Sequence, residues 1–207
     1  MTARAPRHVV DLAHEITDGM VTYPGIPAPT FGSHLSFDES ASHYAPGTEF
    51  SIGMITLATN TGTYLDTPAH RYRDGDDLSA LPLDRMVDLD VTGRAVLVET
   101  GHARHWGTDA YFSDHPYLTA DAADWLVEHG AALVGIDSLN IDGTSTGERP
   151  AHSRLLAAGI PVVEHLTGLD RLPDDGFRFS AAPPRVAGLG TFTVRAFAVV
   201  EGPPDPA

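Results

Sequence analysis

The residues best suited to chemistry lie in one short polar segment of the sequence, residues 60–70. If this segment is extended, every second side chain points to the same face, because side chains alternate along a strand. That face would carry Asn60, Gly62, Tyr64 and Asp66. Pro68 then turns the chain, which would bring His70 back towards the same cavity. A row of polar side chains facing one cavity fits a site whose ligands are oxygen and nitrogen atoms. The alternative interpretation of this segment is a solvent-exposed edge strand followed by a turn.

Three side chains of this segment are candidates for catalysis. His70 is the strongest, because an imidazole takes and gives protons near neutral pH; its alternative role is a bond to turn backbone. The hydroxyl of Tyr64 could donate to a developing oxyanion, or act as a base against an ordinary pKa of about 10. Otherwise Tyr64 only fills space. Asn60 could orient the carbonyl of a substrate.

Further candidates lie outside the segment. His152 falls early in an expected helix and Glu164 ends an expected buried strand, positions that by themselves are typical of solvent-facing residues. Three aromatic residues could line a pocket, with core packing as the alternative. They are Tyr23, Phe31 and Trp106.

Two groups of basic residues complete the set. Arg71 and Arg73 flank a turn and could meet an anionic substrate. His102, His105 and His115 lie in a stretch rich in Gly, Asp and Pro. Their proximity in the sequence would suit a short-range metal cluster, but they lack helical spacing, so we expect them to be histidines of a surface loop.

The apolar pattern predicts the elements that must position these residues. Expected strands cover residues 7–12, 49–59, 94–99, 131–136, 160–163 and 191–200. Expected helices cover residues 120–129 and 150–158. Each is followed by a glycine, and Thr119 is the expected N-cap of the first. Residues 23–29 contain three prolines and are expected to form an extended loop.

The order of these elements indicates one mixed α/β domain. Two strand–helix–strand passages follow a mostly β first half, an arrangement typical of a mixed fold. We expect a single domain over residues 1–207, with flexible ends at 1–6 and 202–207.

Composition excludes several kinds of function. The net charge of -15 argues against nucleic acid and against an anionic membrane surface as partners. The absence of cysteine excludes disulfides and thiolate metal sites, so any metal would need ligands from His, Asp, Glu or Asn. No apolar run approaches the ~18 residues of a membrane span, and no signal peptide is recognisable, so we expect a cytoplasmic location.

The segment at 60–70 resembles the signature of the cyclase family, His-x-Gly-Thr-His-x-Asp-x-Pro-x-His. That family includes bacterial kynurenine formamidases and isatin hydrolases. The resemblance continues in the same order along nearly the whole chain. It covers residues 11–16, 19–27, 125–138, 151–169 and 177–179.

The resemblance implies a swivelling β/β/α domain that assembles as a dimer or tetramer and acts on a small-molecule substrate. It also implies one or two divalent metals, zinc or manganese. In such proteins the Asp of the signature, a downstream His and a downstream Glu are ligands. Here these are Asp66, His152 and Glu164. The last His of the signature, which assists catalysis, is His70.

The departure from the signature leaves the chemistry open. Asn60 and Tyr64 stand where the family has two metal-binding histidines, and both are weaker ligands than imidazole. The remaining ligands could hold one metal or form a metal-free acid–base cluster. The first hypothesis is a hydrolase of amides or formamides of small aromatic or cyclic molecules. The second is a metal-poor or metal-free lyase, dehydratase or cyclase of specialised metabolism that uses His70 and Tyr64. The third is a catalytically silent binding protein.

Overall fold

The computed structural model describes residues 7–82, 89–90 and 95–202. The ends expected to be flexible therefore lie outside the described residues, except for residue 202. The strands are β1 (Arg7–Asp11), β2 (Thr30–Leu35), β3 (Ile52–Thr56), β4 (Tyr64–Asp66), β5 (Leu89–Asp90), β6 (Ala95–Val98), β7 (Leu133–Ile136), β8 (Val162–Glu164), β9 (Phe177–Ser180), β10 (Thr191–Thr193) and β11 (Phe197–Glu201). The α-helices are α1 (Phe37–Ala41), α2 (Pro68–Arg71), α3 (Ala120–Glu128) and α4 (Pro150–Ala157). Short 3-10 helices are η2 (His102–His105), η3 (Asp109–Phe112) and η4 (Leu169–Arg171).

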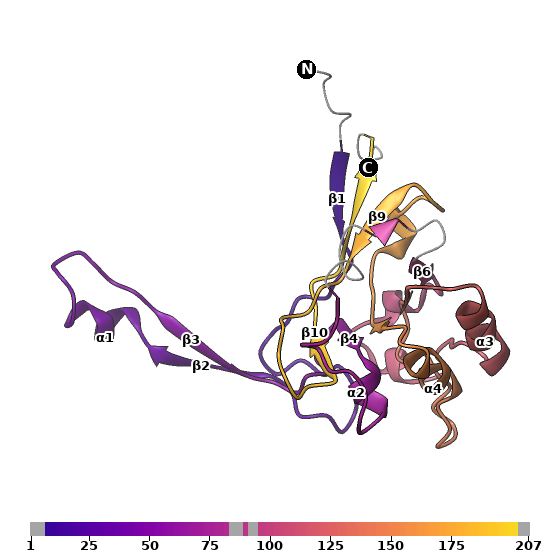
Figure 1. Cartoon of the computed structure of the whole chain (residues 1–207). Coiled ribbons are helices and arrows are strands. Elements are labelled where there is room, and N and C mark those ends of the chain that lie inside the picture. Colours follow the sequence, from indigo (N-terminus) through magenta and orange to yellow (C-terminus); the bar gives the residue numbers. More distant parts are fainter. Residues whose placement is uncertain (1–6, 83–88, 91–94, 203–207) are drawn as a thin grey trace.

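The body of the molecule has three layers: two sheets and a pair of helices (Figure 1). A four-stranded sheet has the order β1-β11-β9-β5, and a five-stranded sheet has the order β10-β4-β8-β7-β6. Apolar side chains from both sheets, such as Leu65, Val163 and Phe179, share one core. A second core joins β7 and β8 to α3 and α4. This is the β/β/α arrangement that the family resemblance implies.

The helical layer follows the sequence prediction closely. The Thr119 side chain accepts a hydrogen bond from the N–H of Ala122, so the predicted N-cap is confirmed. Both crossovers, β6–α3–β7 and β7–α4–β8, join parallel strands. β7 is buried along its whole length because helices cover one face and the other sheet covers the second. The predicted strand at 94–99 is confirmed as β6, although residue 94 lies outside the described part.

The prediction of one strand over residues 191–200 is wrong. β10 belongs to the five-stranded sheet and β11 to the four-stranded sheet. Between them Val194 and Ala196 are buried, while Arg195 is exposed and pairs with Asp11 at 2.7 Å. The apolar alternation continues across the crossing because both sheets face the same core. Periodicity alone therefore does not reveal that the chain changes sheets.

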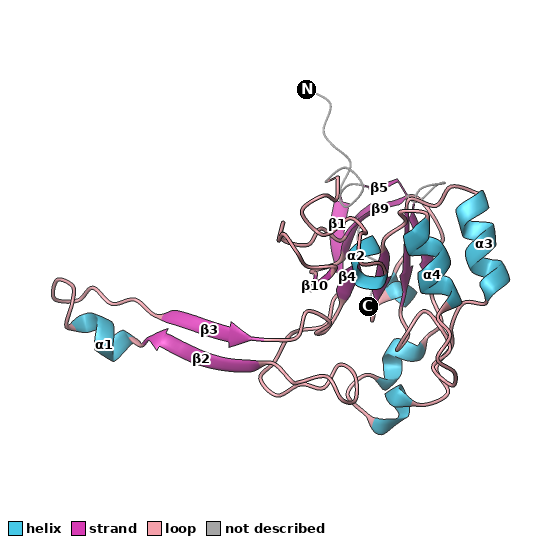
Figure 2. Cartoon of the chain, turned by 60° about the horizontal axis from the view of Figure 1, so that its bottom comes forward, coloured by secondary structure: helices cyan, strands magenta, loops and turns pink. Residues whose placement is uncertain are grey.

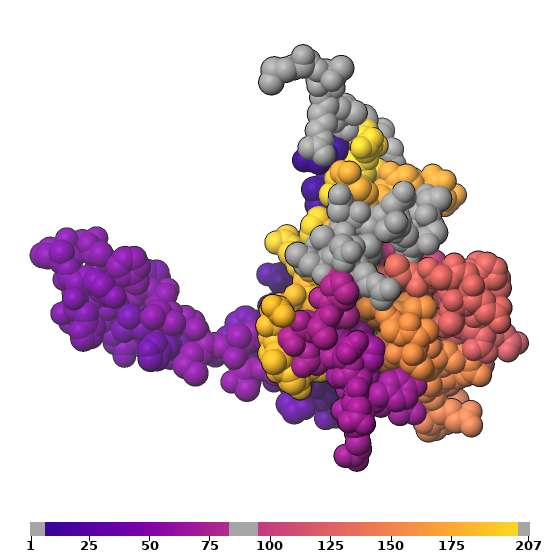
Figure 3. Space-filling view, in the orientation of Figure 1, coloured from indigo at the N-terminus to yellow at the C-terminus, as the bar shows by residue number. Residues whose placement is uncertain are grey.

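The predicted strand at 49–59 is present but shorter, and its apolar residues face solvent. β2, α1 and β3 form an arm that projects from the body in two different views (Figures 1 and 2). It also stands clear of the rest of the surface in the space-filling view (Figure 3). Seven large apolar side chains on the arm have exposed fractions between 49% and 57%: Phe31, Phe37, Tyr44, Phe50, Ile52, Met54 and Ile55.

Within the part of the chain that the structure describes, no helix combines the length and the apolar character that crossing a membrane requires.

Candidate active site

Asp66 is the centre of the site, as a buried carboxylate without a hydrogen-bond donor. Along β4, Leu65 points into the core between the sheets, so Tyr64 and Asp66 point to the opposite, helix-covered face. Asp66 is 0% exposed, and neither carboxylate oxygen accepts a hydrogen bond from the described residues. Two imidazoles approach it: His70 Nδ1 lies 3.5 Å from Oδ1 and His152 Nε2 lies 3.6 Å from Oδ2. A buried carboxylate left in this state is costly unless a cation compensates it.

His70 reaches Asp66 through a short helix rather than through a simple turn. Pro68 occupies the first turn of α2, where its fixed φ suits a helix start, and His70 follows on the side of the site. Gly190 makes this packing possible, because a Cβ there would collide with the backbone of Ala69 and His70. The carbonyl of Gly190 also accepts hydrogen bonds from Thr67 N–H and Oγ1, both at 2.8 Å. The predicted return of His70 to the cavity is confirmed.

His152 is aimed at Asp66 by a residue that the sequence reading missed, Asp142. The Asp142 carboxylate accepts hydrogen bonds from the N–H of Ala151 at 2.6 Å and of His152 at 3.0 Å. It also accepts one from His152 Nδ1 at 2.7 Å, which leaves Nε2 pointing into the site. Burial opposes ionisation of Asp142, yet these hydrogen bonds hold its pKa below the ordinary value. The N-cap position of α4 is Arg149, so Asp142 caps the helix from a distant loop position that no local sequence signal marks.

The charges around His152 favour a positive charge at this position. Burial opposes protonation, but the carboxylates of Glu164, Asp142 and Asp66 outweigh it and raise the pKa of His152 to about 10. Nε2 lies 3.7 Å from Glu164 Oε1. Burial also raises the pKa of Glu164, and the charge of Asp66 adds to that shift. The site therefore stabilises either a proton on His152 or a bound cation.

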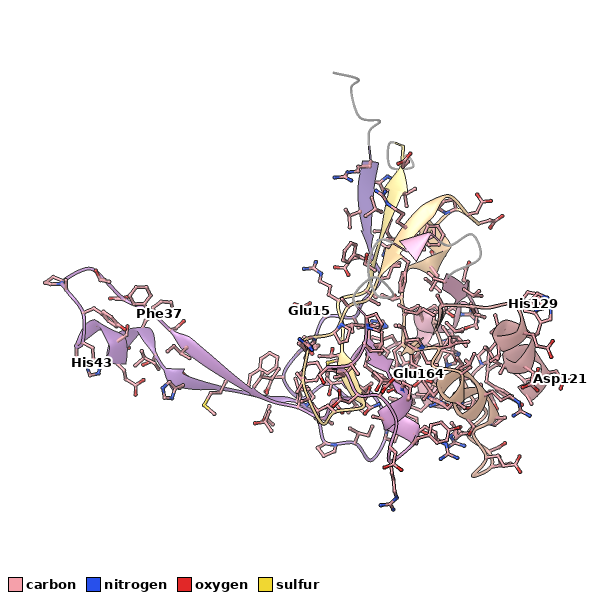
Figure 4. The ribbon with its side chains drawn as sticks, viewed as in Figure 1. Glu15, Phe37, His43, Asp121, His129 and Glu164 are labelled. Carbon is pink, nitrogen blue, oxygen red and sulfur yellow. The ribbon has the colours of Figure 1, made fainter. Side chains whose placement is uncertain are left out.

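Glu164 differs from Asp66 because both of its oxygens have donors. Oε1 accepts from the N–H of Ile141 at 2.5 Å, and Oε2 accepts from the hydroxyl of Tyr64 at 2.7 Å. Glu164 lies within the body of the molecule, away from the arm that carries Phe37 and His43 (Figure 4). The predicted convergence of Asp66, His70, His152 and Glu164 on one site is confirmed.

A hydrogen-bonded chain of buried groups continues behind Glu164. His165 Nε2 lies 3.3 Å from the Tyr64 oxygen, and His165 Nδ1 lies 2.8 Å from the Tyr111 hydroxyl. Because Tyr64 donates to Glu164, Nε2–H of His165 donates to Tyr64 and Tyr111 donates to Nδ1. Burial lowers the pKa of His165 to about 3, so the ring is neutral. A neutral ring is what this hydrogen-bond pattern requires, because Nδ1 must accept. Neither His165 nor Tyr111 was predicted.

These hydrogen bonds change the role expected of Tyr64. Burial, followed by the charges of Glu164 and Asp66, raises the pKa of Tyr64 well above its ordinary value. Its proton is already donated to Glu164, so neither a base nor an oxyanion donor is available at this hydroxyl. Tyr64 instead positions Glu164.

Asn60 reaches the same cavity by a different route from the one predicted. Gly62 has a left-handed φ of 65°, so the segment is not extended from residue 60 to residue 66. Asn60 nevertheless lines the same cavity as Tyr64. The alternation argument was wrong here, although its conclusion for Asn60 holds.

The site opens into a cavity of about 350 Å³. Its lining consists of Tyr23, Ile26, Asn60, Tyr64, His70, Arg71, Asn140, Arg149, His152 and Glu164. Of the three aromatic candidates only Tyr23 lies here. Phe31 is on the arm, and Trp106 stacks on His14 with ring centres 3.8 Å apart.

The prediction that His102, His105 and His115 belong to a surface loop is wrong for two of them. His102 and His115 are buried, with exposed fractions of 6% and 8%. η2 and η3 fold back on one another, and His102 Nε2 lies 2.9 Å from the carbonyl of Tyr111. Backbone carbonyls of this compact loop take the place of water as hydrogen-bond partners of the two buried rings. The amino-acid composition of the loop does not reveal this burial.

Known proteins are similar to this chain in sequence and in fold. The Cyclase family model matches residues 10–92 and 90–143. The kynurenine formamidase of Erythrobacter litoralis is 25% identical over 201 residues, which cover 88% of this chain and 89% of the relative. That of Salinibacter ruber is 28% identical over 222 residues, covering 96% and 99%.

The structure of isatin hydrolase A from Labrenzia aggregata, bound to benzyl benzoate, superposes with a TM-score of 0.77 at 19% identity. The alignment covers 94% of both chains, so the three-layer fold is shared along nearly the whole length.

Proposed function

Since this chain belongs to the cyclase family, we propose that it is a metal-dependent hydrolase of amides. Its substrates would be small aromatic or cyclic molecules with an amide or formamide C–N bond. The names of relatives, kynurenine formamidase and isatin hydrolase, support this reaction class. The observation that carries the proposal is the Asp66 carboxylate, buried without donors and facing two imidazoles.

The donor atoms of the site fit one divalent cation. Ligand bonds of about 2.0–2.2 Å place neighbouring donors of a tetrahedral site roughly 3.3–3.6 Å apart. The distances from His152 Nε2 to Asp66 and Glu164 are 3.6 Å and 3.7 Å. Asp66, His152 and Glu164 are the proposed ligands. Imidazole and carboxylate donors suit zinc and manganese, which are the proposed metals.

His70 borders the same group of donors on its open side. Ligand atoms of Asp66, His70 and His152 all lie within 4.8 Å of one another, so His70 is a geometric rival of Glu164 as third ligand. Its side chain is 35% exposed, whereas those of the three proposed ligands are nearly inaccessible. Exposure to the cavity suits a residue that exchanges protons with substrate and solvent, so we assign His70 to proton transfer.

The proposed reaction adds water across the amide bond and yields a carboxylic acid and an amine. A divalent cation held by Asp66, His152 and Glu164 would supply Lewis acidity to polarise the carbonyl. His70 takes a proton from the attacking water and gives it to the leaving nitrogen, which completes the proton balance. Asn60 and Asn140 line the cavity and offer amide groups to orient the substrate. Tyr64 and Asp142 act indirectly, by holding Glu164 and His152.

The role of Tyr64 also bears on the metal-free alternative. A metal-free lyase or cyclase that uses His70 and Tyr64 needs a Tyr64 proton that can move. That proton is donated to Glu164, and the pKa of Tyr64 is raised well above its ordinary value. The hydrolase is therefore the better supported reading.

The test combines metal analysis with a simple formamide. We expect about one equivalent of zinc or manganese per chain, and hydrolysis of formanilide that stops on chelation and returns with metal. Asp66→Asn would lose both the metal and the activity. Hydrolysis that survives complete removal of metal would contradict the proposal.

We further infer that the chain forms a homo-oligomer, a dimer or tetramer, and works in the cytoplasm. The apolar arm supports self-association, because exposed apolar surface of this extent is unusual on a monomer. Analytical ultracentrifugation of the wild type and of Met54→Lys tests this. A monomeric wild type would contradict it.

A further inference from the structure

Two arginines stand at the mouth of the site cavity. Arg71 ends α2, and Arg149 precedes α4. Both also line a second, outer hollow of about 720 Å³, so the two hollows meet at these side chains. Other residues around the outer hollow include Glu148, Ser153 and Arg154.

Both arginines are oriented by neutral groups. Arg71 Nε donates to Ser153 Oγ at 3.3 Å, and its guanidinium lies 5.3 Å from the ring centre of Tyr72. Arg149 uses Nη1 alone to donate to backbone carbonyls. These are the carbonyls of Gly143 at 3.3 Å, Thr146 at 2.8 Å and Glu148 at 2.7 Å.

Within the described residues, neither guanidinium has a carboxylate oxygen within 4.0 Å, although the chain has 28 acidic and only 13 basic residues. Arg154 pairs with Asp124 at 2.6 Å and Arg195 pairs with Asp11 at 2.7 Å. Other arginines also bond to neutral groups: Arg104, Arg171 and Arg185. What distinguishes Arg71 and Arg149 is their position: both lack a carboxylate partner among the described residues and both line the ligand cavity, where an anionic group from outside can pair with them.

The charges of the cavity are separated along its length. Asp66 and Glu164 lie at the inner end, and Arg71 and Arg149 lie at the outer end. An anionic group on a ligand is therefore repelled from the inner end and attracted to the outer one. Tyr23 and Ile26 add apolar wall that suits a flat ring. A guanidinium also matches the planar geometry of a carboxylate better than an ammonium does.

We propose that Arg71 and Arg149 bind a carboxylate of the substrate, so that the enzyme selects amides that carry an anionic group away from the scissile bond. This inference rests on the proposed hydrolase function and adds the substrate class. The carboxylate points outward, which places the amide next to Asp66, His70 and His152.

The test uses two probes of the same shape, 3-formamidobenzoate and its neutral counterpart 3-formamidobenzamide. We expect kcat/KM of the metal-loaded wild type to be at least about tenfold higher for the carboxylate, as one charge-assisted interaction allows. Arg71→Gln and Arg149→Gln each reduce this ratio, mainly through KM. The ratio also falls with added salt, because partly exposed charges are screened.

Arg154→Gln is the matched control. Arg154 lines the same outer hollow, but its charge is paired with Asp124, so its loss is expected to leave the ratio unchanged. Arg149 also holds three backbone carbonyls, so its variant is checked by thermal unfolding. Arg71 is exposed and holds only Ser153, which keeps the test valid if the Arg149 variant fails to fold.

Calorimetric binding of both probes separates this inference from the proposed function. If neither probe is hydrolysed, the proposed function fails, while tighter binding of the carboxylate that depends on Arg71 still supports the arginine site. Equal affinity for the two probes, or a preference that Arg71→Gln and Arg149→Gln leave intact, would overturn it.

Discussion

The two carboxylates of the site have opposite surroundings. Glu164 has a donor for each oxygen and is backed by a closed chain of Tyr64, His165 and Tyr111. Asp66 is equally buried but has no donor, and the two imidazoles beside it lie beyond hydrogen-bond distance. The Glu164 side has a hydrogen-bond donor for each oxygen, whereas the Asp66 side needs a positive charge, from a proton on His152 or from a bound cation.

This contrast bears on the predicted departure from the family signature. Tyr64, which by that resemblance stands where the family has a metal-binding histidine, donates a hydrogen bond to Glu164. The substitution builds the closed side and leaves Asp66, His70 and His152 grouped on the other. In the proposed cation site Glu164 Oε1, which lies 3.7 Å from His152 Nε2, joins Asp66 and His152 as a ligand, and the closed side holds Glu164 in place.

The largest expected effect on the open side comes from His70. Removal of a group that transfers protons in the rate-limiting step typically costs about 10²–10⁴-fold in rate. We expect His70→Ala to lower kcat by that amount while metal content stays near one equivalent. Loss of the metal in this variant would instead make His70 a ligand and move Glu164 out of the set.

A smaller effect is expected where the protein holds the open side in place. Asp142→Asn weakens the hydrogen bond that fixes His152, and loss of such an outer partner typically costs about 10–100-fold in metal affinity. Titration with zinc in a competing chelator measures the change. Asp124→Asn, in an exposed ion pair, is the control and should bind zinc as the wild type does.

A change on the closed side should affect mainly stability, because Glu164 Oε1 keeps its hydrogen bond from Ile141 and still faces His152. Tyr64→Phe leaves Glu164 Oε2 and His165 Nε2–H without partners, at a cost of about 1–3 kcal/mol in the free energy of unfolding. Chemical denaturation of metal-free protein checks this. The control is Tyr23→Phe. The Tyr23 hydroxyl makes no described side-chain hydrogen bond, so its loss should change stability little. Equal stabilities for the two variants would remove the distinction between the two sides.

Acid should weaken the closed side through His165. Its folded pKa of about 3 lies below the ordinary value of 6.5, so protons bind the unfolded chain more readily. The stabilising contribution is complete above about pH 6.5 and is lost as the pH falls towards 3; at pH 5 the loss is about 2 kcal/mol. His165→Gln should flatten this part of the stability curve.

Local features of the fold were predictable, and long-range ones were not. The Thr119 cap, the buried strands around residues 133–136 and 162–164, and α4 follow from residue types close together in the sequence. The split of residues 191–200 between two sheets depends on a core that both sheets share, which no local pattern encodes.

The same division holds for the site. Asp66 and His70 were found from the polar segment at 60–70 and its family signature, and His152 and Glu164 were found from the resemblance of residues 151–169 to the family. Asp142 and His165 were missed, since each acts through a neighbour that only the folded chain brings close. Gly190 likewise matters only because α2 packs against it.

The most direct test of the cation site is calorimetric titration of metal-free protein with zinc or manganese in buffers of different protonation enthalpy. Because the pKa of His152 is about 10 without metal, binding at neutral pH should occur with one equivalent and release about one proton. Asp66→Asn should abolish this binding. Absence of binding in the wild type, or unchanged binding by Asp66→Asn, would contradict the account.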